Sequence, residues 1–174
     1  MTGFGRSRIL RPVLAGFLLA GAGVGPAGCA TQLAPPYDAD LYGGIASSNE
    51  TALQLFAKLE SGSPKADEPK YDDDYAKVIG SFEALKVRAE SRPFPPLSLR
   101  IAKMPFLKKV CDINSDSACL DATGHALGQI AEDFRVLRSK HMKGDLSHDA
   151  VDLVRRGYNV EISQALSVET ALKR

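Results

Sequence analysis

The chain has 174 residues, of which 44% are hydrophobic, and its 22 Lys and Arg nearly balance its 21 Asp and Glu, for a formal net charge of +1. That length is enough for one domain with a real hydrophobic core. Nothing in this near balance of charge suggests the basic face that nucleic-acid binding demands, so we expect no nucleic-acid partner.

The N-terminal segment has the layout of a secretory signal. Residues 1–12 carry Arg6, Arg8 and Arg11 and no acid, and residues 13–24 are apolar but rich in glycine. This apolar run is too short to cross a bilayer, which takes about 20 residues. A basic start followed by a short apolar stretch is typical of an export signal. Since no later segment is long and apolar enough to span a membrane, we expect a soluble mature chain.

A cysteine follows small residues at the point where such signals are cleaved. The segment Pro26-Ala27-Gly28-Cys29 resembles the lipobox of bacterial lipoproteins, although Pro26 stands where that family prefers leucine or another aliphatic residue. The resemblance implies lipid on the thiol of Cys29, cleavage on its N-terminal side and acylation of the new amine. Because Ala30 is not aspartate, it also implies an outer-membrane location.

This resemblance divides the chain into three parts. We expect a signal peptide over residues 1–28, a flexible tether rich in Pro and Gly over residues 29–44, and a helical domain over residues 45–174. The alternative is ordinary signal cleavage, for example after Ala22 or Ala30, which would release a soluble periplasmic protein.

Assigning Cys29 to lipid leaves Cys111 and Cys119, which are close in the sequence. An oxidising envelope permits a disulfide between them, and closing so short a loop contributes about 2–3 kcal/mol in the chain-entropy model. The alternative is a thiol pair that binds metal, but no histidine or third cysteine lies near at ligand spacing. We therefore predict one disulfide.

From residue 45 onward, the apolar residues recur at helical spacing. The pattern predicts helices over residues 45–60 (or 49–60), 71–91, 97–103, about 119–141 and 147–172. The short helix at 97–103 is broken by the proline that follows it. These elements predict an all-α fold, an antiparallel helical bundle of three to four long helices plus a short broken helix, with one disulfide.

Polar residues mark the expected helix starts. Residues 47–49 offer three N-caps for the first helix, and Ser147 is expected to cap the last. The run Asp72-Asp73-Asp74 falls in the first predicted turn of the second helix, where acids favour the helix dipole. A Ca²⁺ site is the alternative interpretation of those three acids, and the dipole explains them without one.

A second acidic segment lies between the two later cysteines. Asp112, Asn114 and Asp116 match the first three ligand positions of a Ca²⁺-binding loop. The match then fails, because Ser117 and Thr123 stand where that loop needs glycine and a bidentate glutamate. Asp112, Asn114 and Asp116 are therefore weak metal candidates, and a chain turn that caps the next helix is the favoured interpretation.

Small and charged residues also interrupt two apolar stripes. Gly124 and Gly128 flank the stripe of the helix ending near residue 141, and Arg155 and Glu169 intrude on the apolar face of the last helix. Tight helix packing and an edge position explain them in an ordinary bundle. The alternative is a ligand groove formed by Gly124, Gly128, Arg155 and Glu169.

Catalytic motifs are not found in the sequence. His125, His141 and His148 form no H-x-x-x-H pattern, and no G-x-S-x-G occurs. We therefore expect no enzyme and no cofactor. The domain looks like the small helical lipoproteins of Gram-negative bacteria. We expect a lipid-anchored envelope protein that acts as a non-catalytic interaction or scaffold module facing the periplasm, with an envelope protein as partner. The alternative is a periplasmic helical bundle that binds a small ligand or metal.

Overall fold

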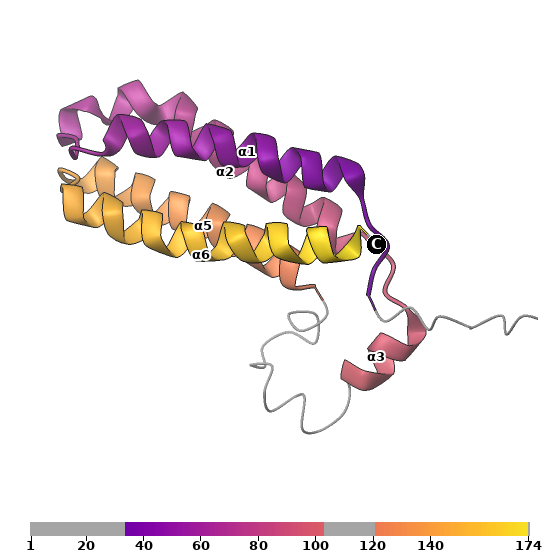
Figure 1. The fold of residues 1–174 in the computed structure, drawn as a ribbon. Coiled ribbons are helices and arrows are strands. Elements are labelled where there is room, and N and C mark those ends of the chain that lie inside the picture. The colour runs from indigo at the N-terminus through magenta and orange to yellow at the C-terminus, as the bar shows by residue number, and fades with distance from the viewer. Residues whose placement is uncertain (1–33, 103–120, 174) are drawn as a thin grey trace, which may run out of the picture. The chain divides into compact units, whose positions relative to one another are not determined.

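The structure is a computed structural model that describes residues 34–102 and 121–173 (Figure 1). Its described residues form helices and one isolated β-bridge, which confirms the all-α prediction. The elements are α1 (Ala39–Leu59), the short 3₁₀ helix η1 (Lys65–Asp67), α2 (Glu68–Glu90), α3 (Pro96–Ala102), α5 (Ala122–Lys143) and α6 (His148–Leu172).

The four long helices pack as an antiparallel bundle. Helix α1 lies beside α2 and α6, and α5 lies beside the same two helices, so each long helix has two adjacent neighbours in the bundle (Figure 1). One end of the bundle, which we call the terminal end, holds the start of α1, the end of α2, the start of α5 and the end of α6. The opposite end, which we call the loop end, holds the two turns at residues 60–67 and 144–147.

The two turns of the loop end are joined by backbone hydrogen bonds. The N–H of Ser63 donates to the carbonyl oxygen of Leu146 at 2.9 Å, and the N–H of Leu146 donates back at 2.8 Å. This isolated bridge links the α1–α2 connection to the α5–α6 connection, so both helical hairpins are held together at the loop end.

Helix α1 begins earlier than its apolar pattern alone predicts. Asp38 is the N-cap, and its carboxylate accepts hydrogen bonds from the backbone N–H groups of Asp40 and Leu41, both at 3.0 Å. An aspartate in this position satisfies donors that the first turn leaves open. The side chain of Leu41 is fully buried, so the helix gains core contact from its first turn.

This start changes two expectations from the sequence. Residues 39–44, predicted as the end of a flexible tether over residues 29–44, are the first turns of α1, and Pro35 before them is already buried. The N-caps predicted at residues 47–49 are wrong, because those residues lie inside the helix and Ser48 faces the core. A serine or asparagine side chain acts as an N-cap only at the first residue of a helix, and these residues lie within one.

The start of α2 also differs from its prediction. The helix begins at Glu68 with a proline in its first turn, so the three acids at residues 72–74 lie beyond the first turn. Asp72 pairs with Arg138 of α5, and Asp74 pairs with Lys58 of α1 through an Nζ–Oδ2 distance of 2.6 Å. These two acids therefore point to different helices and act in ion pairs.

Helix α6 starts as predicted. The hydroxyl of Ser147 accepts a hydrogen bond from the N–H of Ala150 at 3.2 Å, which confirms Ser147 as the N-cap. The helical spacing of apolar residues in the last three long helices also corresponds to their buried faces. The buried members are Tyr75, Val78, Phe82 and Ala89 of α2, Leu127, Ile130, Phe134 and Leu137 of α5, and Val151, Tyr158, Ile162 and Ala165 of α6.

The centre of the core is an aromatic layer to which each long helix contributes one ring. Tyr158 of α6 lies 5.3 Å from Phe56 of α1, 5.8 Å from Phe134 of α5 and 6.2 Å from Phe82 of α2, measured between ring centroids. All four side chains are fully buried. Tilted and edge-to-face pairs at these distances are favourable beyond the burial of their surface, so this layer links all four long helices.

Substitution of two glycines tests the backbone conformation at these positions, because one glycine has open space around it and the other is crowded. Gly80 lies inside α2 with no atom near the position of an added β-carbon, whereas Gly62 has φ +83° and an added β-carbon there would lie 2.5 Å from the carbonyl oxygen of Leu146. We expect Gly80→Ala to raise the free energy of unfolding by about 0.5–1 kcal/mol, because alanine is the better helix former. We expect Gly62→Ala to lower it by about 1–3 kcal/mol.

Urea unfolding followed by circular dichroism measures both changes, and the wild-type chain is the reference. A stabilising effect of Gly62→Ala would contradict the left-handed turn at the loop end. A strong loss with Gly80→Ala would contradict the exposed helical position of that glycine.

None of the helices in residues 34–102 and 121–173 has an apolar stretch long enough to cross a membrane.

Candidate functional site

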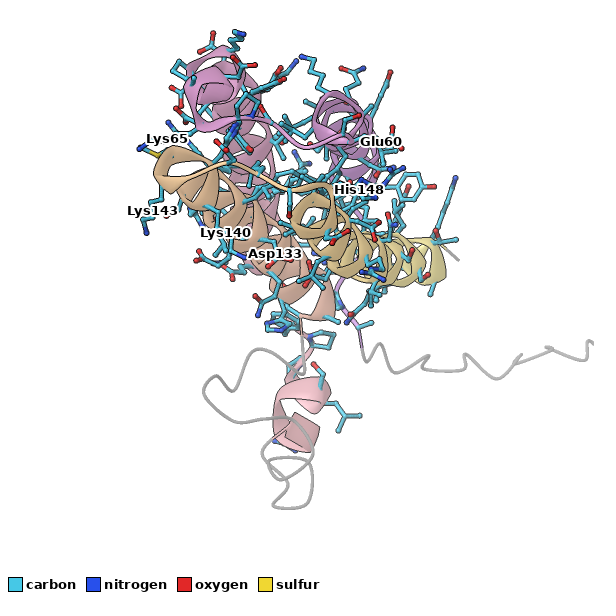
Figure 2. The ribbon with its side chains drawn as sticks, turned by 90° about the vertical axis from the view of Figure 1, so that its left-hand side faces the viewer. Glu60, Lys65, Asp133, Lys140, Lys143 and His148 are labelled. Carbon is cyan, nitrogen blue, oxygen red and sulfur yellow. The ribbon has the colours of Figure 1, made fainter. Side chains whose placement is uncertain are left out.

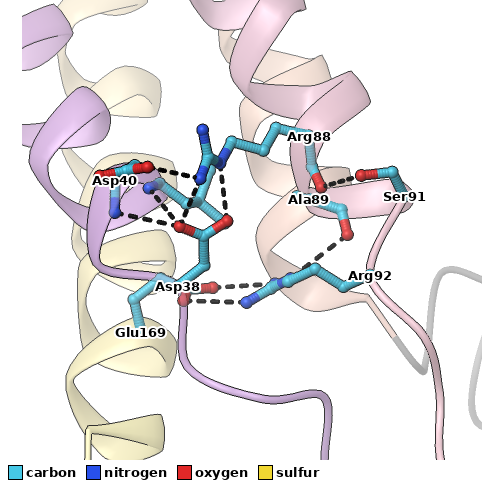
Figure 3. A network of polar contacts seen from close by, with 8 residues as sticks. Asp38, Asp40, Arg88, Ala89, Ser91, Arg92 and Glu169 are labelled. Atoms are coloured by element: carbon cyan, nitrogen blue, oxygen red, sulfur yellow. Dashed lines mark hydrogen bonds and ion pairs between the residues drawn. The ribbon is translucent and has the colours of Figure 1, made fainter.

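The main polar cluster of the described residues lies at the terminal end. It consists of Arg92, Asp121, Thr123 and Glu169, and we call it the terminal-end network. Nη1 and Nη2 of Arg92 approach the two carboxylate oxygens of Glu169, each at 2.9 Å (Figure 3). The hydroxyl of Thr123 donates to Oε1 of the same glutamate at 2.7 Å, and Arg92 Nη2 lies 3.7 Å from Asp121 Oδ1.

Three different helix ends supply these side chains. Arg92 follows the last turn of α2, and its Nε donates to the carbonyl oxygen of Ala89 at 3.3 Å. Asp121 is the N-cap of α5 and accepts the N–H of Gly124 at 2.9 Å. Glu169 belongs to the last turns of α6. The terminal-end network therefore ties together the end of α2, the start of α5 and the end of α6.

Burial makes the terminal-end network a structural element. Glu169 and Thr123 are 0% exposed, Asp121 is 5% exposed and Arg92 is 7% exposed. Two acids surround one guanidinium, and the backbone donors at the start of α5 offset part of the remaining negative charge. Both oxygens of Glu169 already accept hydrogen bonds from its neighbours. A carboxylate held in this way stabilises the fold and is not placed to take a proton from a substrate.

A second ionic cluster lies beside the first and faces solvent. Nε of Arg88 lies 2.6 Å from Oδ2 of Asp38, and Nη2 lies 2.8 Å from Oδ1 of Asp38 and 2.9 Å from Oδ2 of Asp40 (Figure 3). The guanidinium of Arg88 holds the pKa of Asp38 below its usual value. This cluster fastens the N-cap of α1 to the last turns of α2.

An open hollow of about 310 Å³ lies next to both clusters. It is lined by the residues that lead into α1 and by the arginine of the terminal-end network: Pro36, Tyr37, Asp38, Ala39, Asp40 and Arg92. Its charged side chains, Asp38, Asp40 and Arg92, already bind one another or their neighbours. The hollow therefore has few polar groups that are free to bind a ligand.

The four residues of the predicted groove have different surroundings. A β-carbon added at Gly124 would lie 2.6 Å from Asp121 Oδ2, and one added at Gly128 would lie 3.3 Å from Cδ of Lys86. The space above each glycine is thus filled by a side chain. Glu169 is buried near Gly124 in the terminal-end network, whereas Arg155 is half-buried further up α6. At both glycines a larger side chain would have to displace a neighbouring one.

Two histidines contact backbone carbonyl oxygens at the loop end, each a different one. His141 is fully buried, with Nε2 3.2 Å from the carbonyl oxygen of Pro64 and Nδ1 3.3 Å from the hydroxyl of Tyr75. A neutral ring fits both contacts, since a carbonyl accepts at Nε2–H and the tyrosine donates to Nδ1. His148 is exposed, and its Nδ1 lies 2.6 Å from the carbonyl oxygen of Glu60.

Several predicted sites lie outside the described residues. These are the lipidation site Cys29, the cysteines Cys111 and Cys119, and the weak metal candidates Asp112, Asn114 and Asp116. Within residues 34–102 and 121–173, no three His, Cys, Asp or Glu side chains gather as a metal site would require.

The terminal-end network was only partly visible in the sequence. The signal that could have found it is Glu169, an acid inside the apolar stripe of the last helix, which required a buried cation from another element. No family model, curated protein or solved structure matches this chain.

Proposed function

We propose that this protein is a lipid-anchored protein of the cell envelope, whose bundle acts as a non-catalytic interaction or scaffold module facing the periplasm. The observation that carries the proposal is the sequence Pro26-Ala27-Gly28-Cys29 behind a basic start and a short apolar run. Two or three acyl chains on Cys29 would hold the chain stably at a membrane, where a single chain binds only marginally. A disulfide between Cys111 and Cys119 belongs to the same proposal.

The arrangement of the bundle supports a definite orientation for such an anchored protein. The chain from Cys29 to Ala34, the first described residue, reaches at most about 18 Å. The described chain enters the bundle at the terminal end, where Asp38 caps α1. An anchor at Cys29 would therefore keep the terminal end near the membrane. The loop end would point away by the length of α1, about 30 Å for its 21 residues.

The side chains of the loop end fit a polar partner. Glu60, Lys65, Lys140, Lys143 and His148 are exposed there (Figure 2). The carbonyl oxygen of Glu60 and nearby acids raise the pKa of His148, which favours its charged form. Charges of both signs suit a hydrated protein surface and not the interior of a bilayer. We place the docking surface for the proposed envelope partner at this end.

Metabolic labelling with a palmitate analogue tests the anchor. We expect label on the wild-type chain and on Cys111→Ser, and its loss with Cys29→Ser, because only the cysteine of the lipobox is acylated. Cys111→Ser is the matched control, since it also removes one thiol. Equal labelling of the Cys29→Ser variant and the wild type would refute the anchor.

Site-specific photo-crosslinking in cells tests the orientation. A photoreactive side chain at Lys143 of the loop end is expected to form a discrete crosslinked product with an envelope protein. The matched control is Val87, which is exposed near the other end of the bundle. The same product from Val87, or products from Val87 alone, would contradict docking at the loop end.

A further inference from the structure

Helix α3 is the described helix that packs against none of the others. It spans Pro96–Ala102, and within residues 34–102 and 121–173 it is in contact with neither the long helices nor η1. Leu97 is 39% exposed, and none of the described α3 side chains belongs to the hydrophobic core. A helix of only seven residues is marginal in water, so α3 is stabilised by a surface that covers Leu97.

The connector from α2 keeps α3 near the terminal end of the bundle. Arg92 is fixed there by Glu169 at 2.9 Å. The residues between Arg92 and α3 are Pro93, Phe94 and Pro95. So short a connection reaches at most about 14 Å, and its prolines hold the residues before them in extended geometry. The start of α3 therefore stays close to the terminal end, whatever direction the helix takes.

The charge of α3 has a single sign. Its sequence contains Arg100, which is exposed, and no acid. The other described helices, α1, η1, α2, α5 and α6, each carry acids as well as basic residues. In the sequence, no Asp or Glu stands between Glu90 and Asp112. An apolar side chain beside a cation, with no acid near it in the sequence, complements a surface that is negative outside and apolar beneath, as an anionic bilayer is.

We propose that α3 and its connector form a second contact between this protein and a membrane, in which Leu97 enters the interface of an anionic bilayer and Arg100 binds lipid phosphate. A long cationic side chain keeps its charged group in the headgroup layer while its stem lies along apolar surface. The inference rests on the membrane location proposed above and deepens it, because an anchor at Cys29 would keep this same end of the bundle near the membrane.

Such a contact serves to orient the bundle. One short helix with one cation binds a bilayer weakly by itself, since binding strength scales with the buried apolar area and the number of charges. When another part of the chain already holds the protein at the membrane, the second contact forms at a high effective concentration. Two contacts at the terminal end limit the tilt of the bundle and keep the loop end directed away from the membrane.

The emission of a single tryptophan tests this contact, because the chain contains none. The full chain with Leu97→Trp is reconstituted into vesicles of phosphatidylcholine and phosphatidylglycerol. We expect its emission to move to shorter wavelength than in buffer and to be quenched by brominated acyl chains. Because α3 has no packing partner among the described helices, the variant should melt at the same temperature as wild type. Emission unchanged by the vesicles would overturn the proposal.

Val87→Trp provides the matched control. Val87 is 62% exposed and lies near the terminal end of α2, so it is close to the same membrane without belonging to α3. Its emission is expected to stay as in buffer. Equal shifts at both positions would mean that the whole terminal end adsorbs to the vesicle, which would overturn a specific contact by α3.

A charge reversal tests the part played by the cation. Arg100→Glu, added to Leu97→Trp, is expected to abolish the emission shift. Arg156→Glu makes the same change of charge on exposed α6 and should preserve the shift. A shift that survives Arg100→Glu, or that is as large on vesicles of phosphatidylcholine alone, would overturn binding to anionic lipid. A shift produced by soluble polyglutamate but not by vesicles would indicate an acidic protein partner and overturn the membrane contact.

Flotation with the vesicles is checked before emission is read, so the chain is known to be membrane-bound whichever part binds it. Loss of the palmitate label would therefore refute the anchor at Cys29 alone. An absent emission shift in floating vesicles would refute the contact of α3 alone.

Discussion

Replacing Glu169 by alanine is expected to lower the free energy of unfolding by about 3–5 kcal/mol, because it removes one partner of a buried ion pair. Arg92 would keep its charge at 7% exposure, with only Asp121 at 3.7 Å to balance it. The hydroxyl of Thr123 would also lose its acceptor. Since a domain of this size is stable by only about 5–15 kcal/mol, this single change removes a large part of its stability.

The matched control for this prediction is Glu83→Ala. Glu83 and Arg135 also form an interhelical glutamate–arginine pair, with an N–O distance of 2.7 Å, but both side chains are substantially exposed. Exposed pairs contribute about 0–1 kcal/mol, so the control should lose little. Urea unfolding of both variants measures the contrast. Equal and small losses would contradict the burial of the terminal-end network.

Truncation of the central tyrosine is the second change with a large expected effect. Tyr158→Ala removes the ring that touches Phe56, Phe82 and Phe134, the aromatic members of the three other long helices. Deleting a buried aromatic side chain costs about 3–5 kcal/mol, because the cavity collapses only in part. We expect a loss in that range and, since all four long helices meet at this layer, a single cooperative transition that shifts as a whole.

Two variants show which part of Tyr158 matters. Tyr158→Phe keeps the ring and removes only the hydroxyl that donates to Asn49 Oδ1 at 2.6 Å, so we expect a loss of about 1 kcal/mol. Val160→Ala, on the same helix but 68% exposed, should change stability by less than about 0.5 kcal/mol. A loss with Tyr158→Phe as large as that with Tyr158→Ala would contradict the dominant role of ring packing.

The regular parts of the fold were predictable because their causes are local. The apolar spacing of Tyr75, Val78 and Phe82 marks the buried face of α2 regardless of what covers that face. Ser147 caps α6 through an N–H only three residues away. Periodicity and capping of this kind need no knowledge of the partner helices, which is why the class of fold and the buried stripes are confirmed.

The start of α1 was not predictable in the same way, because several cap residues compete. Residues 47–49 and Asp38 all have side chains that cap helices. Asp38 is the N-cap because of contacts that form only in the folded protein. Its carboxylate also binds Arg88 of α2, 50 residues further along the chain, and the turn that it starts buries Leu41.

By itself, then, the sequence determined the helical class and the faces that the last three long helices bury, both of which depend on neighbours within a few residues. Only the tertiary structure decided the state of the charges. From its neighbours in the sequence, Glu169 is interpreted as an acid at the edge of an apolar face. In the structure it is a buried partner of Arg92, because α2 and α6 both end at the terminal end. The cost of burying a charge depends on the groups that surround it in space, and those come from other helices.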